Sequence, residues 1–142
     1  MTSINAQQFI DQYAETLSKG SAELAAGFHL VPSVFMGDHS KQVLQNKNEL
    51  EKILTSILSR CTEAGIVLYQ AEVNQTMRLS DSLFFTTMRW NLYDADNQLR
   101  ISFTASYTMQ ELEDGNLKII VTVVDDDKKQ LEGIFPVWSK EA

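Results

Sequence analysis

Apolar residues in the first half of the chain recur at intervals of three and four, as they do on one face of an α-helix. The clearest such stretch predicts a helix that is capped at Asn46 and stops at Gly65. A similar face predicts a helix from about Asn5 to Lys19, and "SAELAAGF", which starts at Ser21, predicts a short one. The N-terminal part is therefore expected to hold three helices.

After residue 65 the apolar period changes to two, which is the repeat of a strand with one buried face. Four such alternations are predicted as strands, over about residues 67–79, 84–92, 99–109 and 117–124. Short polar stretches separate them, and "EDGN" is a strong hairpin signal because Asp-Gly tolerates the positive backbone angles of a tight turn. We expect these strands to form an antiparallel meander.

A smaller hairpin is predicted between the second and third helices. Pro32 has no amide proton to give to a neighbouring strand, so "HLVPSVFM" is expected to be an edge strand. "GDHS" then forms a turn and "KQVLQ" returns as the partner strand. The whole chain, residues 1–142, is expected to be one α+β domain in which three N-terminal helices and a small hairpin pack on a mostly antiparallel sheet.

Composition supports a globular protein, since 44% of the 142 residues are hydrophobic and 22% are charged. The formal charge of −7 repels phosphate backbones and anionic lipids, so neither a nucleic acid nor a membrane is expected as a partner. No apolar run approaches the roughly 18 residues of a membrane span, and the N-terminus lacks an apolar signal core. A cytoplasmic location is therefore predicted, and no feature calls for a cofactor.

The order of these elements resembles the nuclear transport factor two-like superfamily, whose SnoaL-like and ketosteroid-isomerase-like members are cone-shaped α+β barrels. The segments that carry the resemblance are "FIDQYAETLSKGSAELAAGF", "VLQNKNELEKIL" and "SYTMQELEDGNLKI". The resemblance implies a curved sheet that wraps the helices around a pocket. Because the superfamily holds isomerases, dehydratases, hydrolases, cyclases and non-catalytic binding modules, it indicates a fold more than a function.

One motif resembles a catalytic segment. "QYAETLSKG" is similar to the first helix of ketosteroid isomerase and places Tyr13 where that enzyme keeps an oxyanion-stabilising tyrosine. Met36 and Ala105 fall at the positions of its general base and second acid, and neither can transfer a proton. Asp38 could reach the same face through a bulge, or it could be a solvated turn residue. With its neighbour His39, the catalytic candidates are Tyr13, Asp38 and His39.

No metal site is predicted. Zinc needs three or four convergent ligands, and His29 lies ten positions before His39, with Pro32 between them. We expect His29 to start a strand with one hydrogen bond and His39 to lie at an exposed tip. The acidic run at 125–127 lacks the glycine and distal glutamate of a calcium loop.

Large aromatic and thioether side chains are the candidates for a pocket that takes a flat apolar ligand, unless they simply fill the core. The predicted ligand-binding residues are Tyr13, Phe28, Met36, Met88, Trp90, Phe103 and Tyr107. The leading functional hypothesis is a domain that binds a small hydrophobic molecule. The alternative is an isomerase, dehydratase or cyclase that acts on a polycyclic or polyketide-like substrate by general acid/base chemistry.

The second face of the predicted sheet carries short, often β-branched side chains and a single charge, which suits contact between two sheets. Its members are Thr87, Arg89, Asn91, Tyr93, Ser102, Thr104, Ser106, Thr108, Ile120, Thr122 and Val124. A homodimer through this face is expected, with Thr104 and Thr122 near its centre. Arg89 is expected at the rim or opposite an acid of the partner.

Overall fold

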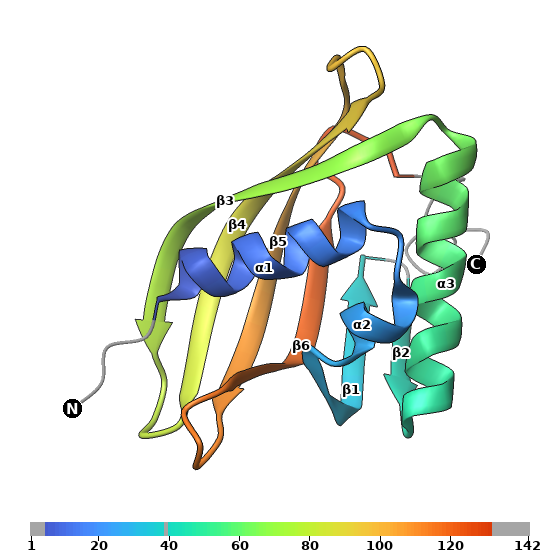
Figure 1. Cartoon of the computed structure of the whole chain (residues 1–142). Helices are drawn as coiled ribbons and strands as arrows, with labels where there is room; N and C mark the ends of the chain where they lie inside the picture. The colour runs from blue at the N-terminus through green and yellow to red at the C-terminus, as the bar shows by residue number, and fades with distance from the viewer. Residues whose placement is uncertain (1–4, 39, 132–142) are drawn as a thin grey trace.

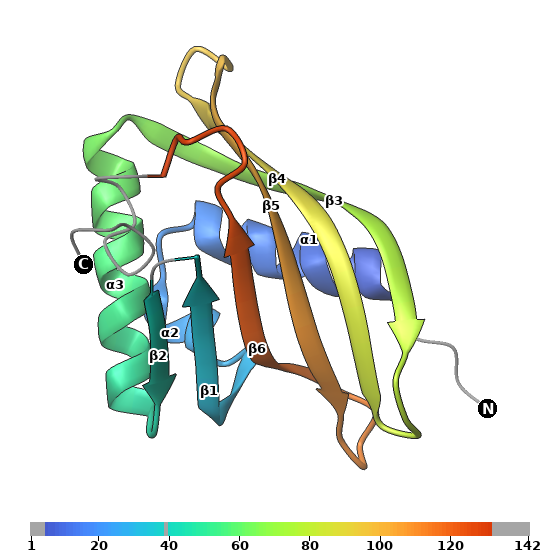
Figure 2. The ribbon, with the colours of Figure 1, turned by 180° about the vertical axis from the view of Figure 1, so that it is seen from behind.

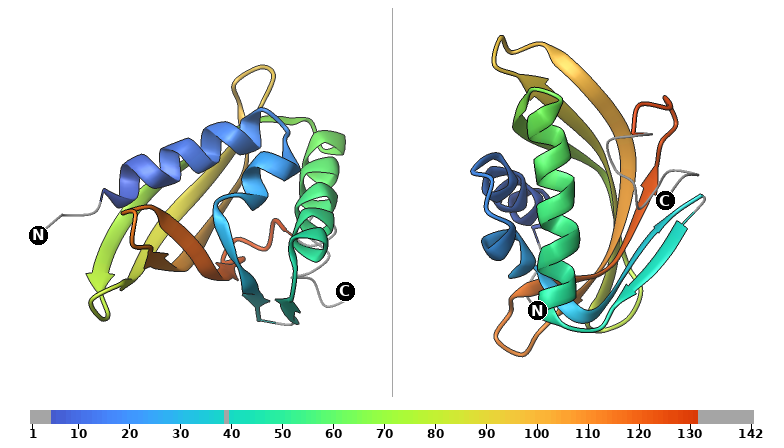
Figure 3. Two further views of the ribbon diagram at one scale, coloured as in Figure 1. Left: turned by 60° about the horizontal axis from the view of Figure 1, so that its bottom comes forward. Right: turned by 90° about the vertical axis from the view of Figure 1, so that its right-hand side faces the viewer.

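One curved sheet of six strands forms the body of the molecule, and the helices lie on its concave side (Figures 1 and 3). The computed structural model describes residues 5–38 and 40–131. The helices are α1 (Ala6–Ser18), α2 (Ala22–Ala26) and α3 (Lys47–Glu63). The strands are β1 (His29–Gly37), β2 (Ser40–Leu44), β3 (Ile66–Arg78), β4 (Leu83–Asp94), β5 (Leu99–Glu111) and β6 (Leu117–Asp125). The expected α+β class and curved, mostly antiparallel sheet are confirmed.

The helices begin at side-chain caps that the sequence predicts. The side chains of Asn5 and Asn46 accept hydrogen bonds from the backbone amides of Gln8 and Glu49 at the starts of α1 and α3. Helix α2 is shorter than its expected span and ends at Gly27. The chain then continues directly into β1, which is a strand of the sheet.

The strands are ordered β2-β1-β6-β5-β4-β3. Strands β3 to β6 form the predicted antiparallel meander, and β1 and β2 form the predicted hairpin. A parallel pairing of β1 with β6 joins the hairpin to the meander. This pairing extends one curved surface across the whole sheet and encloses the helices on one side.

The prediction that β1 is an edge strand is wrong, because β1 lies between β2 and β6. Its register against β6 shifts between His29 and Val34, and its pairing with β2 begins only at Ser33. Pro32 lies in this gap and is exposed to solvent. An interior strand can therefore hold the proline, since no ladder hydrogen bond is required of it.

The predicted orientation of β6 is also wrong for two residues. Where its register against β5 shifts, β6 carries one extra residue, Ile120, and the alternation of its side chains is reset. Thr122 and Val124 consequently face the core and are 5% and 4% exposed. Val121 and Val123 take their places on the outer face, so Thr122 cannot lie at the centre of a contact there.

The core fills the space between the concave face and the helices. Alternate residues of β4 and β5 point inward and are buried, namely Phe84, Thr86, Met88, Trp90, Leu92, Ile101, Phe103, Ala105, Tyr107 and Met109. They pack against the buried faces of α1 and α3. Within residues 5–38 and 40–131, no helix has the length and apolar character needed to cross a bilayer.

Candidate ligand pocket

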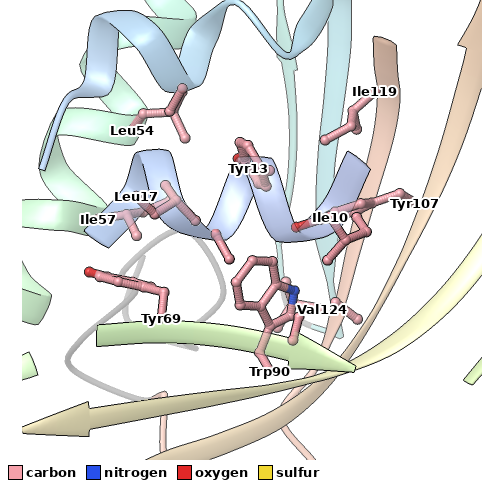
Figure 4. Close-up of a cluster of buried hydrophobic side chains, with 14 of the residues drawn as sticks. Ile10, Tyr13, Leu17, Leu54, Ile57, Tyr69, Trp90, Tyr107, Ile119 and Val124 are labelled. Atoms are coloured by element: carbon pink, nitrogen blue, oxygen red, sulfur yellow. The ribbon is translucent and has the colours of Figure 1, made fainter. Parts of the chain in front are cut away.

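A small internal pocket lies between α1, α3 and the concave face of the sheet. Figure 4 shows several of its lining side chains, among them Tyr13, Tyr69 and Trp90. Its volume is about 60 Å³. The lining residues are Tyr13, Leu17, Leu54 and Ile57 from the helices and Phe35, Tyr69, Trp90, Leu92, Phe103, Ala105, Tyr107, Thr122 and Val124 from the sheet. None of these side chains carries a charge at neutral pH, so the pocket suits a neutral, largely apolar molecule.

A buried hydrogen bond joins α1 to the start of β1. The Tyr13 hydroxyl lies 2.8 Å from Nε2 of His29, and the two residues are 4% and 6% exposed. Burial, with a smaller contribution from the positive charge of Lys118, lowers the pKa of His29 to about 3. Burial raises the pKa of Tyr13 well above its usual range. Near pH 7 both groups are therefore neutral, which leaves His29 a weak base.

The ring of Tyr13 is the centre of an aromatic cluster beside the pocket. It meets the rings of Phe28, Trp90 and Tyr107 at centroid distances of 5.2, 6.2 and 6.1 Å. The His29 ring lies 5.4 Å from it in an edge arrangement. These contacts hold Tyr13 in one orientation, since tilted aromatic pairs are favourable beyond the area they bury.

Two other tyrosines of the lining have side-chain partners. The Tyr107 hydroxyl interacts with the Trp90 indole, and the Tyr69 hydroxyl interacts with the Cys61 thiol. Burial raises the pKa of Cys61 to about 11, although the interaction with Tyr69 opposes this shift. Cys61 is therefore a protonated, fully buried thiol, in agreement with a packing role.

Thr122 is, with Tyr69, one of two polar lining residues that the sequence did not predict for the pocket. Its Oγ1 is buried and has no hydrogen-bond partner within the part of the chain that the structure describes. The reset alternation after Ile120 brings this hydroxyl to the concave face. A strict period of two along β6 places it outside, so no local sequence signal identifies it.

The structure brings four of the seven predicted ligand-binding residues together in the pocket lining: Tyr13, Trp90, Phe103 and Tyr107. Phe28 and Met88 do not line it. The Phe28 ring packs against the Tyr13 ring without reaching the lining, and the Met88 side chain is fully buried. Met36 lies in the opposite phase of β1, and its neighbour Phe35 lines the pocket in its place.

The catalytic candidates are not brought together around the pocket. Tyr13 lines it, whereas Asp38 is an exposed turn residue after β1 and is absent from the lining. His39 lies outside the described residues. The lining contains no carboxylate and no histidine, so the described pocket has hydrogen-bond donors but no group suited to removing a proton near pH 7.

Two other features bear on possible sites. In residues 5–38 and 40–131, no group of three or more His, Cys, Asp or Glu side chains could hold a metal ion. A larger groove of about 630 Å³ lies between α1 and β3, lined in part by the exposed Asp11, Glu15 and Glu72. Because this groove is open to solvent and has three carboxylates in its lining, the smaller internal pocket is the better candidate for an apolar ligand.

Comparison with known proteins identifies the family. Residues 3–127 match the model of the family described as NTF2-like protein (DUF6841), and the chain therefore belongs to this family. The resemblance to the nuclear transport factor two-like superfamily is thus confirmed. No curated protein matches the chain.

Several solved structures share the fold at low sequence identity. An NTF-2 like protein of unknown function from Shewanella oneidensis has a TM-score of 0.67 and 10% identity, over 84% of this chain and 94% of that chain. A Catenulispora acidiphila protein in complex with S-DNPA has a TM-score of 0.66 and 15% identity, over 88% and 92%. A ketosteroid isomerase-like protein from Erwinia carotovora atroseptica has a TM-score of 0.60 and 11% identity, over 86% and 97%. These likenesses establish the fold alone.

Proposed function

We propose that the chain is a binding domain that holds a small, neutral, apolar molecule in its internal pocket. The observation that carries this proposal is the lining, which is largely apolar and aromatic and contains no charged side chain. Burial of an ionised ligand in such surroundings is costly, whereas burial of an apolar one is favourable. A solved protein of the same fold, in complex with S-DNPA, offers indirect support.

The size of the pocket limits the ligand. Pockets for drug-sized molecules commonly have volumes of about 300–1,000 Å³, and the internal pocket has about 60 Å³. A polycyclic or polyketide-like molecule does not fit this space unless buried side chains move. The proposed ligand is therefore no larger than a single ring or a short branched chain.

Binding is favoured over the catalytic alternative by the state of the polar groups. Tyr13 can donate a hydrogen bond to a substrate oxygen, but the neutral His29 beside it is a weak base. Asp38, the expected proton acceptor, is exposed and absent from the lining. Acid/base catalysis needs a base within hydrogen-bond reach of the substrate, and the described lining supplies none.

The experiment is a thermal-unfolding screen with toluene, phenol, cyclohexane and cyclohexanol as probes. A ligand that binds only the folded state raises the melting temperature. Ala105→Val should abolish this shift because the added methyl groups occupy the pocket, and it should itself raise the unfolding free energy by roughly 0.5–2 kcal/mol. Ser106→Val, the next residue on the opposite face of β5, is the matched control.

Two results would count against the proposal. One is a wild-type melting temperature that none of the four probes shifts at millimolar concentration. The other is a shift that Ala105→Val leaves unchanged, which would place the binding outside the internal pocket.

We also propose that two copies associate through the outer, convex face of the sheet. Within the described residues no helix covers this face, which Figure 2 shows from behind. Outward side chains of β4, β5 and β6 there are short or β-branched and half-buried, including Thr87, Ser106, Thr108, Val121 and Val123. Small side chains allow two sheets to approach closely, and a two-fold axis lets the same face meet itself.

The charge on this face is paired within the chain. Arg89 Nη1 lies 2.8 Å from Asp127 Oδ2, and the guanidinium also donates to the hydroxyls of Ser102 and Thr104. The sequence placed Arg89 at the rim or opposite an acid of the partner. The ion pair with Asp127 removes the need for a partner's acid, so the face can be buried without leaving a lone charge.

A further inference from the structure

The Thr122 side chain has an unused hydrogen-bonding group inside the pocket. The residue is 5% exposed, and its Oγ1 has no partner within the described part of the chain. An unpaired buried hydroxyl destabilises the folded state, because it gives up its hydrogen bonds to water and gains none within the protein. A valine has nearly the same shape without that cost, so threonine at this position stabilises the fold less than valine would.

The neighbours of Thr122 on the sheet explain why its hydroxyl lacks a partner. Phe35 on β1 and Tyr107 on β5 lie opposite it in the two ladders. Phe35 has no polar side-chain atom, and the Tyr107 hydroxyl lies at the far end of its ring, where it interacts with the Trp90 indole. The Thr122 hydroxyl therefore lies between aromatic side chains that line the pocket.

The other hydroxyls of the lining already have side-chain partners. Tyr13 forms a hydrogen bond with His29, and Tyr69 interacts with the Cys61 thiol. Among the described lining residues, Thr122 thus carries the buried side-chain polar atom that has no hydrogen-bond partner within the protein. A hydroxyl can both donate and accept, so its partner can be a carbonyl or another hydroxyl.

We infer that Thr122 hydrogen-bonds a single oxygen of the ligand, which makes the ligand a neutral one-ring alcohol, phenol or ketone. This inference rests on the proposed function, because it assumes that the internal pocket is occupied. A carboxylic acid or an amine does not fit, since no side chain of the lining carries a compensating charge. The remaining lining contacts the apolar body of the ligand.

The test compares two probes of equal size, phenol and toluene, which differ by a hydroxyl in place of a methyl group. Binding to the wild type and to Thr122→Val is measured by isothermal titration calorimetry. Loss of the hydrogen bond should weaken phenol binding roughly tenfold in the variant. Toluene binding should stay the same or tighten, because the variant offers it one more methyl group.

Two further variants keep the result interpretable. Thr122→Ser retains the hydroxyl and should retain the preference for phenol over toluene, even if Thr122→Val packs poorly. Thr108→Val makes the same exchange on the outer face of β5 and should leave both affinities unchanged.

The outcomes separate this inference from the proposed function. If both probes bind and Thr122→Val weakens neither, the role of Thr122 is overturned while the pocket remains a binding site. If neither probe binds the wild type, and cyclohexane and cyclohexanol also leave its melting temperature unchanged, the proposed function fails together with this inference.

Discussion

At the scale of single residues, His29 links pH to the stability of the fold. Its pKa in the folded chain is about 3, against about 6.5 for an unperturbed histidine. Below pH 6.5 the unfolded chain binds a proton that the folded chain excludes. The stability that His29 contributes is therefore fully present above this pH and is lost as the pH falls toward 3.

The expected loss approaches about 1.4 kcal/mol per pH unit well below pH 6.5 and amounts to roughly 1.5–2 kcal/mol between pH 6.5 and pH 5. Urea unfolding at these two pH values measures it. His29→Gln can still pair with the Tyr13 hydroxyl but does not titrate, so its loss over the same interval should be smaller by roughly 1.5–2 kcal/mol. Equal pH dependence in the wild type and the variant would show that His29 is not buried in its neutral form.

The sequence is informative about some pocket residues and silent about others for a physical reason. Trp90, Phe103 and Tyr107 lie on strands whose alternation is regular, so the hydrophobic pattern alone turns them inward. Thr122 lies beyond a register shift, where one extra residue of β6 exchanges the two faces, whereas Phe35 shares the inward phase of His29 and Ser33. The shift in β6 leaves no mark in the apolar pattern, whereas Met36 is predicted from the resemblance, although a period of two along β1 puts Phe35 on the face of His29.

At the scale of secondary-structure elements, α1 covers the outer edge of β3 with its side chains. The Gln7 amide donates to the carbonyl of Ala71 and accepts from the amide of Val73. Ser18 accepts from the amide of Tyr69 further along the same edge. The helix thus provides hydrogen-bond partners for part of this edge. Without them, these backbone groups would be free to pair with another chain.

Gln7→Ala should lower the unfolding free energy by about 1 kcal/mol, because two backbone groups of β3 exchange a side-chain partner for water. The control is Gln8→Ala, an identical change at an exposed position on the same helix, which should have little effect. Urea unfolding of both variants gives the comparison. An equal effect of the two changes would mean that the bonds of Gln7 to β3 add no stability.

At the scale of the whole molecule, the order of helices and strands follows from local patterns, and the closure of the sheet does not. Hydrophobic period and turn residues predict the three helices, the hairpin and the meander. The pairing of β1 with β6 joins segments about ninety positions apart, as in His29 with Ile119. No local pattern specifies such a long-range parallel pairing, which arises from packing of the whole chain.

The proposed dimer is tested at this scale by sedimentation. The wild type should sediment as a species of about twice 16.1 kDa. Ser106→Arg should halve that mass, because Ser106 lies between Thr87 and Val123 on the outer face and the change would bury a charge without a partner.

The matched control for this change is Ser59→Arg on the exposed side of α3, which should leave the mass unchanged. A wild-type chain that sediments as a monomer at micromolar concentration would rule out the dimer.

The pairing of Arg89 with Asp127 also determines how ionic strength acts on two approaching molecules. Because both partners of this ion pair belong to the same chain, the proposed contact needs no attraction between opposite charges of different copies. Each chain carries a formal charge of −7, so two copies repel each other at long range. Added salt shortens the reach of that repulsion to about 8 Å at physiological concentration. Association would therefore strengthen as salt is added, whereas an interface built on ion pairs would weaken.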